Sequence, residues 1–235
     1  NFLSDFYKRR IKRLLPPLII FVLIFSFLLL ILVPQTGASL KTAIASLFAF
    51  SNIYLFNYST DYFAQENDLN VFMHTWSLGV EEQFYLIFPF LVYLTGFSKK
   101  NNNNSSKKLF IIIIFLSVIS LISFIYSYQN NESAAYFLPH NRFWEIAMGC
   151  ITFLLIESNS IFIKKIEKIP KILLITLIIS IFFVSNNNPT LTTILIVSLT
   201  SLLINCLKDR DLVFEFLTNK VLIHIGLISY SLYLW

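Results

Sequence analysis

The sequence has 235 residues, of which 56% are hydrophobic and 13% are charged, and its formal net charge is +5. Soluble domains carry about 25% charged residues, so this composition excludes a soluble globular protein and predicts an integral membrane protein. The basic side chains lie between long apolar runs, as in the cytoplasmic loops of membrane proteins, and do not indicate nucleic-acid binding. The apolar runs leave no room for a fused soluble catalytic domain.

Residues 1 to 16 are polar and strongly basic. Their cations are Lys8, Arg9, Arg10, Lys12 and Arg13. Such a segment is typical of a cytoplasmic anchor beside a membrane helix. Because residues three apart share a helix face, Arg10 and Arg13 would also present two guanidinium groups suited to phosphate. The first crossing is predicted from Pro17 to Val33, with Pro16 and Pro17 marking its start.

A short apolar run from Thr42 to Phe56 is interrupted by Ser46, Ser51 and Asn52. If this run crossed the membrane, every later loop would change sides and the loop lysines would lie outside, against the positive-inside bias. We therefore predict a re-entrant or interfacial helix on the outer side. An acidic outer loop is predicted to follow over residues 57 to 75.

The central segment from Trp76 to Phe97 is apolar except at its head, where Glu81 and Glu82 are adjacent. An ionisable group in a membrane is costly unless it is paired or hydrated, so such carboxylates indicate a functional site by default. Neighbouring residues on a helix point about 100° apart, so the two carboxylates face different surroundings. Each is either a group that binds substrate or carries a proton, or a structural lock to another helix. Pro89 is predicted to kink this helix.

The rest of the chain predicts five further crossings. They are Leu109 to Tyr126, Arg142 to Ile156, Ile172 to Val184, Leu191 to Leu207 and Val221 to Trp235. Residues 99 to 108 are predicted to be a cytoplasmic loop, and residues 127 to 141 an outer loop. The fold class is therefore all-α, a polytopic membrane helix bundle with about seven spans and one re-entrant or interfacial helix.

Polar residues in two of these crossings allow alternative interpretations. Arg142 and Glu145 are three residues apart, so they would share a helix face and pair with each other. The alternative is that Arg142 meets Glu81, Glu82 or a substrate hydroxyl. Tyr230 is either a packing hydroxyl or a substrate contact. Neither cysteine has metal-ligating neighbours, and no metal site is predicted.

Three segments and one weaker match resemble the membrane acyltransferase-3 family, whose members O-acylate cell-surface sugars. The central segment contains Trp76-Ser77-Leu78-Gly79-Val80-Glu81-Glu82-Gln83-Phe84-Tyr85. The flanking segments are Phe6 to Pro16 and Ile225 to Trp235, and the weaker match is Asn141 to Glu145. They occur in the family's order and span the chain from end to end.

The resemblance implies an integral-membrane O-acyltransferase of the bacterial inner membrane. A cytoplasmic acyl-CoA, expected to be acetyl-CoA, would be the donor, with its phosphates bound by Arg10 and Arg13. The carbohydrate acceptor would be a surface polysaccharide, as in lipopolysaccharide modification, or a lipid-linked sugar. The candidate catalytic residues are Glu81 and Glu82, at the outer end of their helix. The candidate substrate-binding residues are Trp76, Arg142, Glu145 and Tyr230.

The family's proposed base is a His that follows an Arg or Lys in the first membrane helix, and none of His74, His140 and His224 has that setting. We therefore expect residues 1 to 235 to be an acyltransferase-3 transmembrane domain that is truncated at both ends and inactive by itself. The alternative function is a transporter or flippase of glycan precursors, because intramembrane charges and a kinked helix also fit transport.

Overall fold

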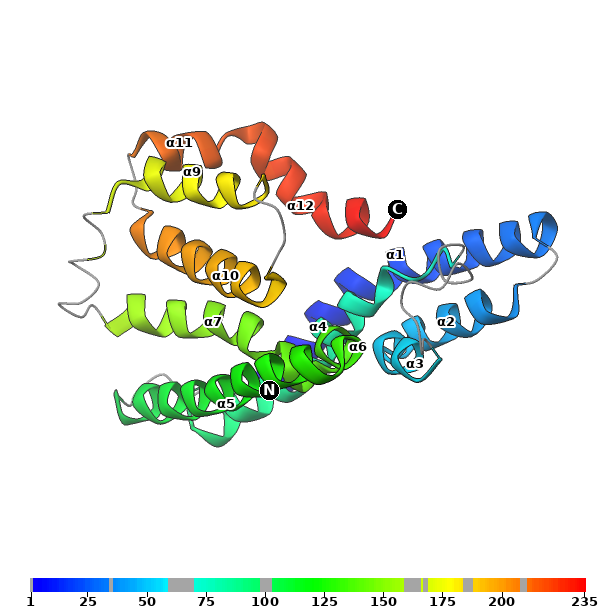
Figure 1. The fold of residues 1–235 in the computed structure, drawn as a ribbon, viewed down its shortest axis with the longest axis horizontal. Helices are drawn as coiled ribbons and strands as arrows, with labels where there is room; N and C mark the ends of the chain where they lie inside the picture. Colours follow the sequence, from blue (N-terminus) through cyan, green and yellow to red (C-terminus); the bar gives the residue numbers. More distant parts are fainter. Residues whose placement is uncertain are drawn as a thin grey trace. The chain divides into compact units, whose positions relative to one another are not determined.

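The computed structural model describes residues 2–33, 36–58, 70–97, 103–158, 166, 169–183, 188–207 and 211–235. Within this part of the chain the regular elements are all α-helices, in agreement with the predicted all-α class (Figure 1). They are α1 (Phe2–Leu32), α2 (Gly37–Leu47), α3 (Ser51–Tyr58), α4 (Thr75–Leu94), α5 (Asn103–Asn130), α6 (Glu132–Phe137), α7 (Pro139–Ser158), α9 (Lys171–Ile181), α10 (Pro189–Cys206), α11 (Leu212–Leu217) and α12 (Lys220–Leu234). The chain divides into two compact units, the first with residues 1–109, 120–143 and 229–235 and the second with residues 110–119 and 144–228.

The first helix is longer than predicted, because the basic segment is helical and continuous with the first crossing. α1 has 31 residues and contains Pro16 and Pro17, so the prediction that these prolines mark its start was wrong. Prolines are tolerated inside membrane helices, where other groups satisfy the carbonyls that they leave without a helical donor. At 1.5 Å per residue α1 is about 46 Å long, against about 30 Å for a hydrocarbon core.

One face of α1 forms the core of the first unit. Its buried residues are Leu18, Phe21, Val22 and Leu29, which cluster with Ala43, Phe72, Leu78 and Leu234. The spacing of three, four and seven residues places the four α1 side chains on one helix face. The remainder of the helix surface exposes apolar side chains such as Leu23, Phe27 and Leu30. An apolar surface of this kind is suited to lipid rather than to water.

Three helices in the described residues are long and apolar enough to cross a membrane. They are α1, the Asn104–Asn130 part of α5, and α10. The predicted count of about seven crossings is not confirmed. For example, α9 covers only 11 residues of the predicted crossing from Ile172 to Val184, which is about 16 Å at 1.5 Å per residue.

The predicted single helix from Thr42 to Phe56 is in fact two helices, α2 and α3, joined by a turn at residues 48–50. Ala49 in this turn has a φ of 60°, in the left-handed region that an alanine seldom adopts. The polar residues Ser51 and Asn52, which interrupted the apolar pattern, begin α3 and are fully buried. The break therefore arises because these side chains find tertiary partners on α4.

Two of the predicted loops contain helix. Residues 103–108 are the first turns of α5 rather than loop, and residues 127–137 contain the end of α5 and all of α6. Asn131 caps α6, since its side chain accepts a hydrogen bond from the Ala134 amide at 3.0 Å. The short helix α11 was also not predicted. The acidic outer loop predicted over residues 57 to 75 lies mostly outside the described residues.

In the second unit, α9 and α10 lie side by side (Figure 1). The hydroxyls of Thr152 on α7 and Ser201 on α10 are 2.7 Å apart. Lys171 at the start of α9 forms a 2.6 Å ion pair with Asp211. These polar contacts join helices whose remaining surface is largely apolar.

Candidate active site

The candidate site lies in the first unit, where α1 and α4 pack antiparallel. The Tyr7 hydroxyl donates to the Leu86 carbonyl at 2.9 Å, and the rings of Phe21 and Phe72 lie edge to face at 5.6 Å. Residue 7 of α1 thus lies beside residue 86, and residue 21 lies beside residue 72, so the numbering of the two segments runs in opposite directions. This arrangement brings the basic turn of α1 against the head of α4, where the two glutamates lie.

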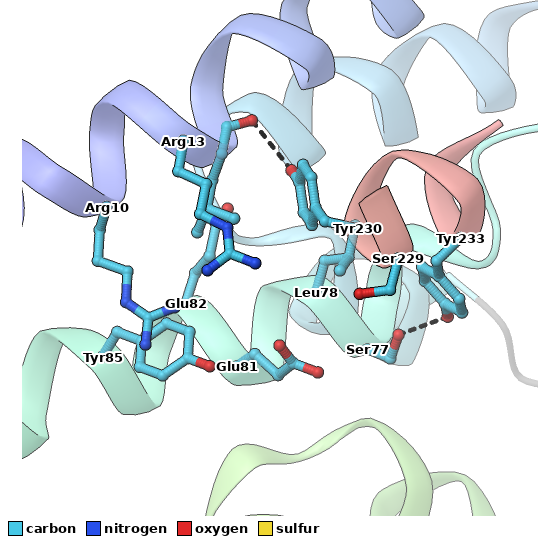
Figure 2. A pocket seen from close by; sticks show the side chains of 11 residues that line it. Arg10, Arg13, Ser77, Leu78, Glu81, Glu82, Tyr85, Ser229, Tyr230 and Tyr233 are labelled. Atoms are coloured by element: carbon cyan, nitrogen blue, oxygen red, sulfur yellow. Dashed lines mark hydrogen bonds between the residues drawn. The ribbon is translucent and has the colours of Figure 1, made fainter. Parts of the chain in front are cut away.

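A cavity of about 490 Å³ lies at this junction, and side chains from three helices line it (Figure 2). The lining residues are Arg10, Arg13 and Leu14 of α1, Ser77, Leu78, Glu81, Glu82 and Tyr85 of α4, and Ser229, Tyr230 and Tyr233 of α12. All of them belong to the first unit. Arg10, Arg13, Glu81, Glu82 and Tyr230, which the sequence singled out separately, therefore meet at one place. We call it the polar cavity.

Helical spacing explains which residues of each helix reach the polar cavity. Arg10 and Arg13 are three residues apart, as are Tyr230 and Tyr233, so each pair shares one helix face. On α4, residues 77, 81 and 85 follow one another at intervals of four along the helix surface. Sequence reasoning missed Ser77, Tyr85, Ser229 and Tyr233. The available signal was a three- or four-residue spacing from Glu81 and Tyr230, which Ser77, Tyr85 and Tyr233 have and Ser229 lacks.

Arg10 is held over an aromatic ring. Its guanidinium carbon lies 3.8 Å from the centre of the Tyr85 ring and 5.7 Å from that of Phe6. A cation over an aromatic face is stabilised by about 0.5–2 kcal/mol, and a stacked guanidinium keeps its edge N–H groups free to bind an anion. Figure 2 shows Arg10 and Arg13 extending from α1 toward α4. Tyr85 therefore orients Arg10 at the cavity wall.

The sequence predicted the arginines on the cytoplasmic side and the glutamates at the outer end of their helix, and the structure brings the two pairs together. Glu81 and Glu82 line the same cavity as Arg10 and Arg13. The reason is that the basic segment continues α1 as a helix, so antiparallel packing sets its third turn against the second turn of α4. Carboxylates and guanidinium groups are thus available to a single ligand.

The end of α12 closes one side of the polar cavity through two tyrosine hydroxyl groups. Tyr230 donates to the Leu14 carbonyl of α1 at 3.1 Å. Tyr233 donates to the His74 carbonyl at 3.0 Å, and its hydroxyl lies 2.6 Å from that of Ser77. The packing interpretation of Tyr230 therefore has a defined partner, while its ring still lines the cavity.

His74 supports this arrangement as a neutral side chain. Its Nε2 lies 3.1 Å from the Leu234 carbonyl, and because a carbonyl only accepts, Nε2 carries the proton. The imidazole also meets the rings of Phe21 and Tyr233 edge to face. Burial lowers the pKa of His74 below its usual 6.5, although its backbone hydrogen bonds act in the opposite direction. His74 therefore fastens α12 to the head of α4.

Other residues of the central segment serve packing. Gln83 donates to the Ala49 carbonyl at 2.7 Å and to Asn52 Oδ1 at 2.9 Å. Asn52 in turn donates to the Phe137 carbonyl at 2.9 Å. A Cβ at Gly79 would lie 2.9 Å from Asn52 Oδ1, so this glycine allows α3 to approach α4 closely. Gln83 and Gly79 thus fix the packing of α4 against α3 and the turn that precedes it.

The remaining predicted site residues lie elsewhere. The Arg142 guanidinium carbon is 5.4 Å from the Trp76 ring, a cation–π contact between α7 and α4. Among the described residues that line the polar cavity, neither Trp76 nor Arg142 is included. Glu145 belongs to the second unit. Arg142 thus contacts α4 through Trp76. The choice between a pair with Glu145 and a contact with Glu81, Glu82 or a substrate hydroxyl stays a prediction.

The polar cavity can bind an anion and hydroxyl groups together. The two guanidinium groups can donate hydrogen bonds to a phosphate. The two carboxylates can accept hydrogen bonds or a proton from a hydroxyl. The tyrosine and serine hydroxyls can act as donor or acceptor. In the part of the chain that the structure describes, no three His, Cys, Asp or Glu residues come together as a metal site.

The family model described as an acyltransferase domain, acyltransferase-3, matches residues 1–235, the whole chain. The chain belongs to the acyltransferase-3 family. It is 30% identical over 248 aligned positions to O-acetyltransferase OatA of Staphylococcus aureus, with 99% of this chain and 40% of that protein covered. A putative O-acetyltransferase of S. aureus strain COL matches with the same identity and coverage. The chain thus spans 40% of the length of these relatives. No solved structure matches it.

Proposed function

We propose that this protein is an integral-membrane O-acetyltransferase of the bacterial inner membrane. It moves the acetyl group of acetyl-CoA to a hydroxyl of a surface polysaccharide or a lipid-linked sugar. The observation that carries the proposal is the polar cavity, in which two arginines and two glutamates meet in a member of an acyltransferase family. The similar S. aureus proteins are named as O-acetyltransferases.

Each side chain has a chemical role in this reaction. Arg10 and Arg13 bind substrate phosphate, that of the donor included, with Tyr85 holding Arg10 in place. Glu81 and Glu82 bind the acceptor hydroxyl and take up or relay its proton. The hydroxyl oxygen then bonds to the thioester carbonyl carbon as the carbon–sulfur bond breaks, and the thiolate of CoA leaves and takes a proton. The resemblance assigns the base itself to a His that these residues do not include.

Transport of a glycan precursor is not favoured as an alternative. Intramembrane charges fit both functions, but the family model that matches the whole chain is an acyltransferase model. The guanidinium groups and the carboxylates line the same cavity. Such a site is suited to bringing two substrates together.

Label transfer tests the proposal with a control matched for charge. The full-length protein in membrane vesicles is supplied with acetyl-labelled acetyl-CoA, and label is followed into the extracted glycan. We expect the Arg10→Ala/Arg13→Ala variant to lose most transfer. The Arg9→Ala/Lys12→Ala variant removes the same charge from exposed positions of the same turns and should retain transfer. If both variants lost transfer equally, the arginine pair would serve only as a membrane anchor. If the wild type transferred no label to glycan, acetyl transfer would be rejected.

A multi-pass arrangement in which the α2–α3 pair enters the membrane from the outer side is also part of the proposal. Positive-inside placement of the loop lysines supports it. A cysteine placed at Asn67 and another at Asn103 should then be labelled by an impermeant thiol reagent from opposite faces of the membrane. Labelling of both from one face would reject this topology.

A further inference from the structure

A second cavity of about 250 Å³ adjoins the polar cavity. Four residues, Arg10, Leu14, Glu82 and Tyr85, line both cavities. The side chains that line the second cavity alone are mostly apolar. We call this cavity the apolar groove, and its main apolar walls are Ile11, Leu15, Leu47, Phe48 and Leu86. All of these residues belong to the first unit.

The apolar groove is open to the surroundings of the helices. Its walls Ile11, Phe48 and Leu86 are 57%, 69% and 54% exposed. In water such a cluster would be costly, whereas in a bilayer it meets hydrocarbon. An occupant can therefore enter the groove sideways from the membrane. This route is suited to the chain of a lipid.

The two cavities together present an apolar surface, a cation and polar groups in that spatial order. The groove offers an apolar surface, Arg10 stands at the border with its guanidinium stacked on Tyr85, and the polar cavity beyond it offers carboxylates and hydroxyls. A hydrocarbon chain, a phosphate and a polyhydroxy head group would meet these surfaces in that sequence. A sugar joined to a lipid through phosphate has this order of groups.

The charges around the border favour an anion in spite of the two glutamates. The first turns of α1 carry five cations, namely Lys8, Arg9, Arg10, Lys12 and Arg13. The carboxylates nearby are Asp5, Glu81 and Glu82, so the cations are in excess. A phosphate at Arg10 thus enters a positive field, while Glu82 remains available for a sugar hydroxyl.

We infer that the groove and the polar cavity together bind a lipid-linked sugar phosphate as the acetyl acceptor. Its chain lies in the apolar groove, its phosphate at Arg10 and its sugar beside Glu81 and Glu82. This inference rests on the proposed function and selects the lipid-linked sugar over the free polysaccharide. Arg13, which lines only the polar cavity, is left for the donor.

The acyl chain of the donor fits the groove less well. An acetyl group has a single methyl and would leave most of the groove empty. In CoA, moreover, a long pantetheine arm separates the phosphates from the acyl group. Here Arg10, which would bind the phosphate, itself lines the apolar groove. A ligand whose phosphate is directly attached to its hydrocarbon chain matches that geometry.

Binding measured without donor tests the inference. Octyl-phosphate-linked N-acetylglucosamine is titrated by calorimetry into the full-length protein in lipid nanodiscs, with empty nanodiscs subtracted. N-acetylglucosamine 1-phosphate, which lacks the chain, and octyl N-acetylglucosaminide, which lacks the phosphate, are the comparison ligands. Each buried methylene contributes about 0.8 kcal/mol, about fourfold in affinity, so we expect the complete probe to bind at least about tenfold tighter than the ligand without the chain. The charge-assisted contact of its phosphate with Arg10 should also make it bind more tightly than the ligand without the phosphate.

Two tryptophan variants on one helix make the test specific. Ile11→Trp fills the groove and should weaken binding of the complete probe about tenfold or more. Leu23→Trp alters a residue that is 64% exposed and lies outside the groove, and it should leave binding unchanged. Equal affinity for the probe with and without its chain would overturn the inference, as would equal effects of the two variants. A preference for hexanoyl-CoA over acetyl-CoA that Ile11→Trp removes would assign the groove to the donor and also overturn it.

The same measurements separate this inference from the proposed function. Specific binding of the complete probe without any acetyl transfer would reject the transferase and leave the lipid-phosphate site standing. Acetyl transfer to soluble glycan, with no chain-dependent binding of the probe, would support the transferase and overturn the lipid-linked acceptor.

Discussion

Replacing Gly79 by alanine tests whether the central segment depends on close helix packing. A Cβ at this position would lie 2.9 Å from Asn52 Oδ1, 3.2 Å from the Ser51 hydroxyl and 3.4 Å from the Ala49 carbonyl. Asn52 cannot simply turn away, because its amide group is hydrogen-bonded to Gln83 and to the Phe137 carbonyl. We therefore expect α3 and α4 to separate or a buried hydrogen bond to break.

The size of the effect follows from two opposing contributions. Alanine is favoured over glycine inside a helix by about 1 kcal/mol. Overpacking costs about 1–3 kcal/mol, and each hydrogen bond lost at Asn52 costs about 1 kcal/mol more. We expect Gly79→Ala to lower the free energy of unfolding by about 1–3 kcal/mol. For a protein of this size the corresponding fall in Tm is about 2–4 °C per kcal/mol.

Gly149 provides the matched control on another helix. A Cβ there would have no heavy atom within 4 Å, so Gly149→Ala should be neutral or should stabilise by up to about 1 kcal/mol. The assay is thermal unfolding of wild type and both variants in the same detergent, followed by circular dichroism. If Gly79→Ala raised Tm as much as Gly149→Ala, the close approach of α3 to α4 would not be a constraint on the fold.

Two further predictions concern ionisable groups. Glu82→Gln should keep the protein folded in the membrane but lower acetyl transfer by tenfold or more, as expected for loss of a general acid or base. Replacement of the exposed Glu157 by Gln should leave transfer unchanged. Full activity of Glu82→Gln would show that Glu82 takes no part in transfer. His74 should make stability depend on pH, because burial lowers its pKa below 6.5 in the folded protein. As the pH falls below 6.5 the unfolded chain takes up a proton that the half-buried His74 resists, so Tm should fall on acidification. His74→Gln should flatten the Tm profile between about pH 7.5 and pH 5.5 relative to wild type and to His140→Gln. Parallel profiles would contradict a neutral, half-buried His74.

The sequence predicted the class of elements well, because apolar periodicity and length report directly on helices. The membrane-capable helices α1, α5 and α10 all contain runs that were predicted as crossings. The boundaries were less accurate wherever a local rule was overridden. Pro16 and Pro17 were read as a helix start, but α1 continues through them. Helix α6 was missed even though Asn131 provides an ordinary N-cap signal.

Polar residues in the apolar runs of this chain serve two different purposes. Glu81 and Glu82 do line a cavity, but Ser51, Asn52 and Gln83 are used to join α3 to α4. Sequence spacing cannot distinguish these uses, because an amide that binds a ligand and one that binds a neighbouring helix have the same local pattern. The distinction comes from the partner, which lies 24 to 31 residues away along the chain.

The sequence by itself determined that this chain is helical and apolar, that its basic residues cluster before the first long apolar run, and that it resembles acyltransferase-3 proteins. These properties depend on composition and on spacing within one helix. Only the tertiary structure decided that Arg10 and Arg13 meet Glu81 and Glu82, that α12 closes the cavity through Tyr230 and Tyr233, and that an apolar groove adjoins it. The physical reason is that such contacts depend on which helix faces pack together and at what register, and packing joins residues that are up to 216 positions apart in the chain.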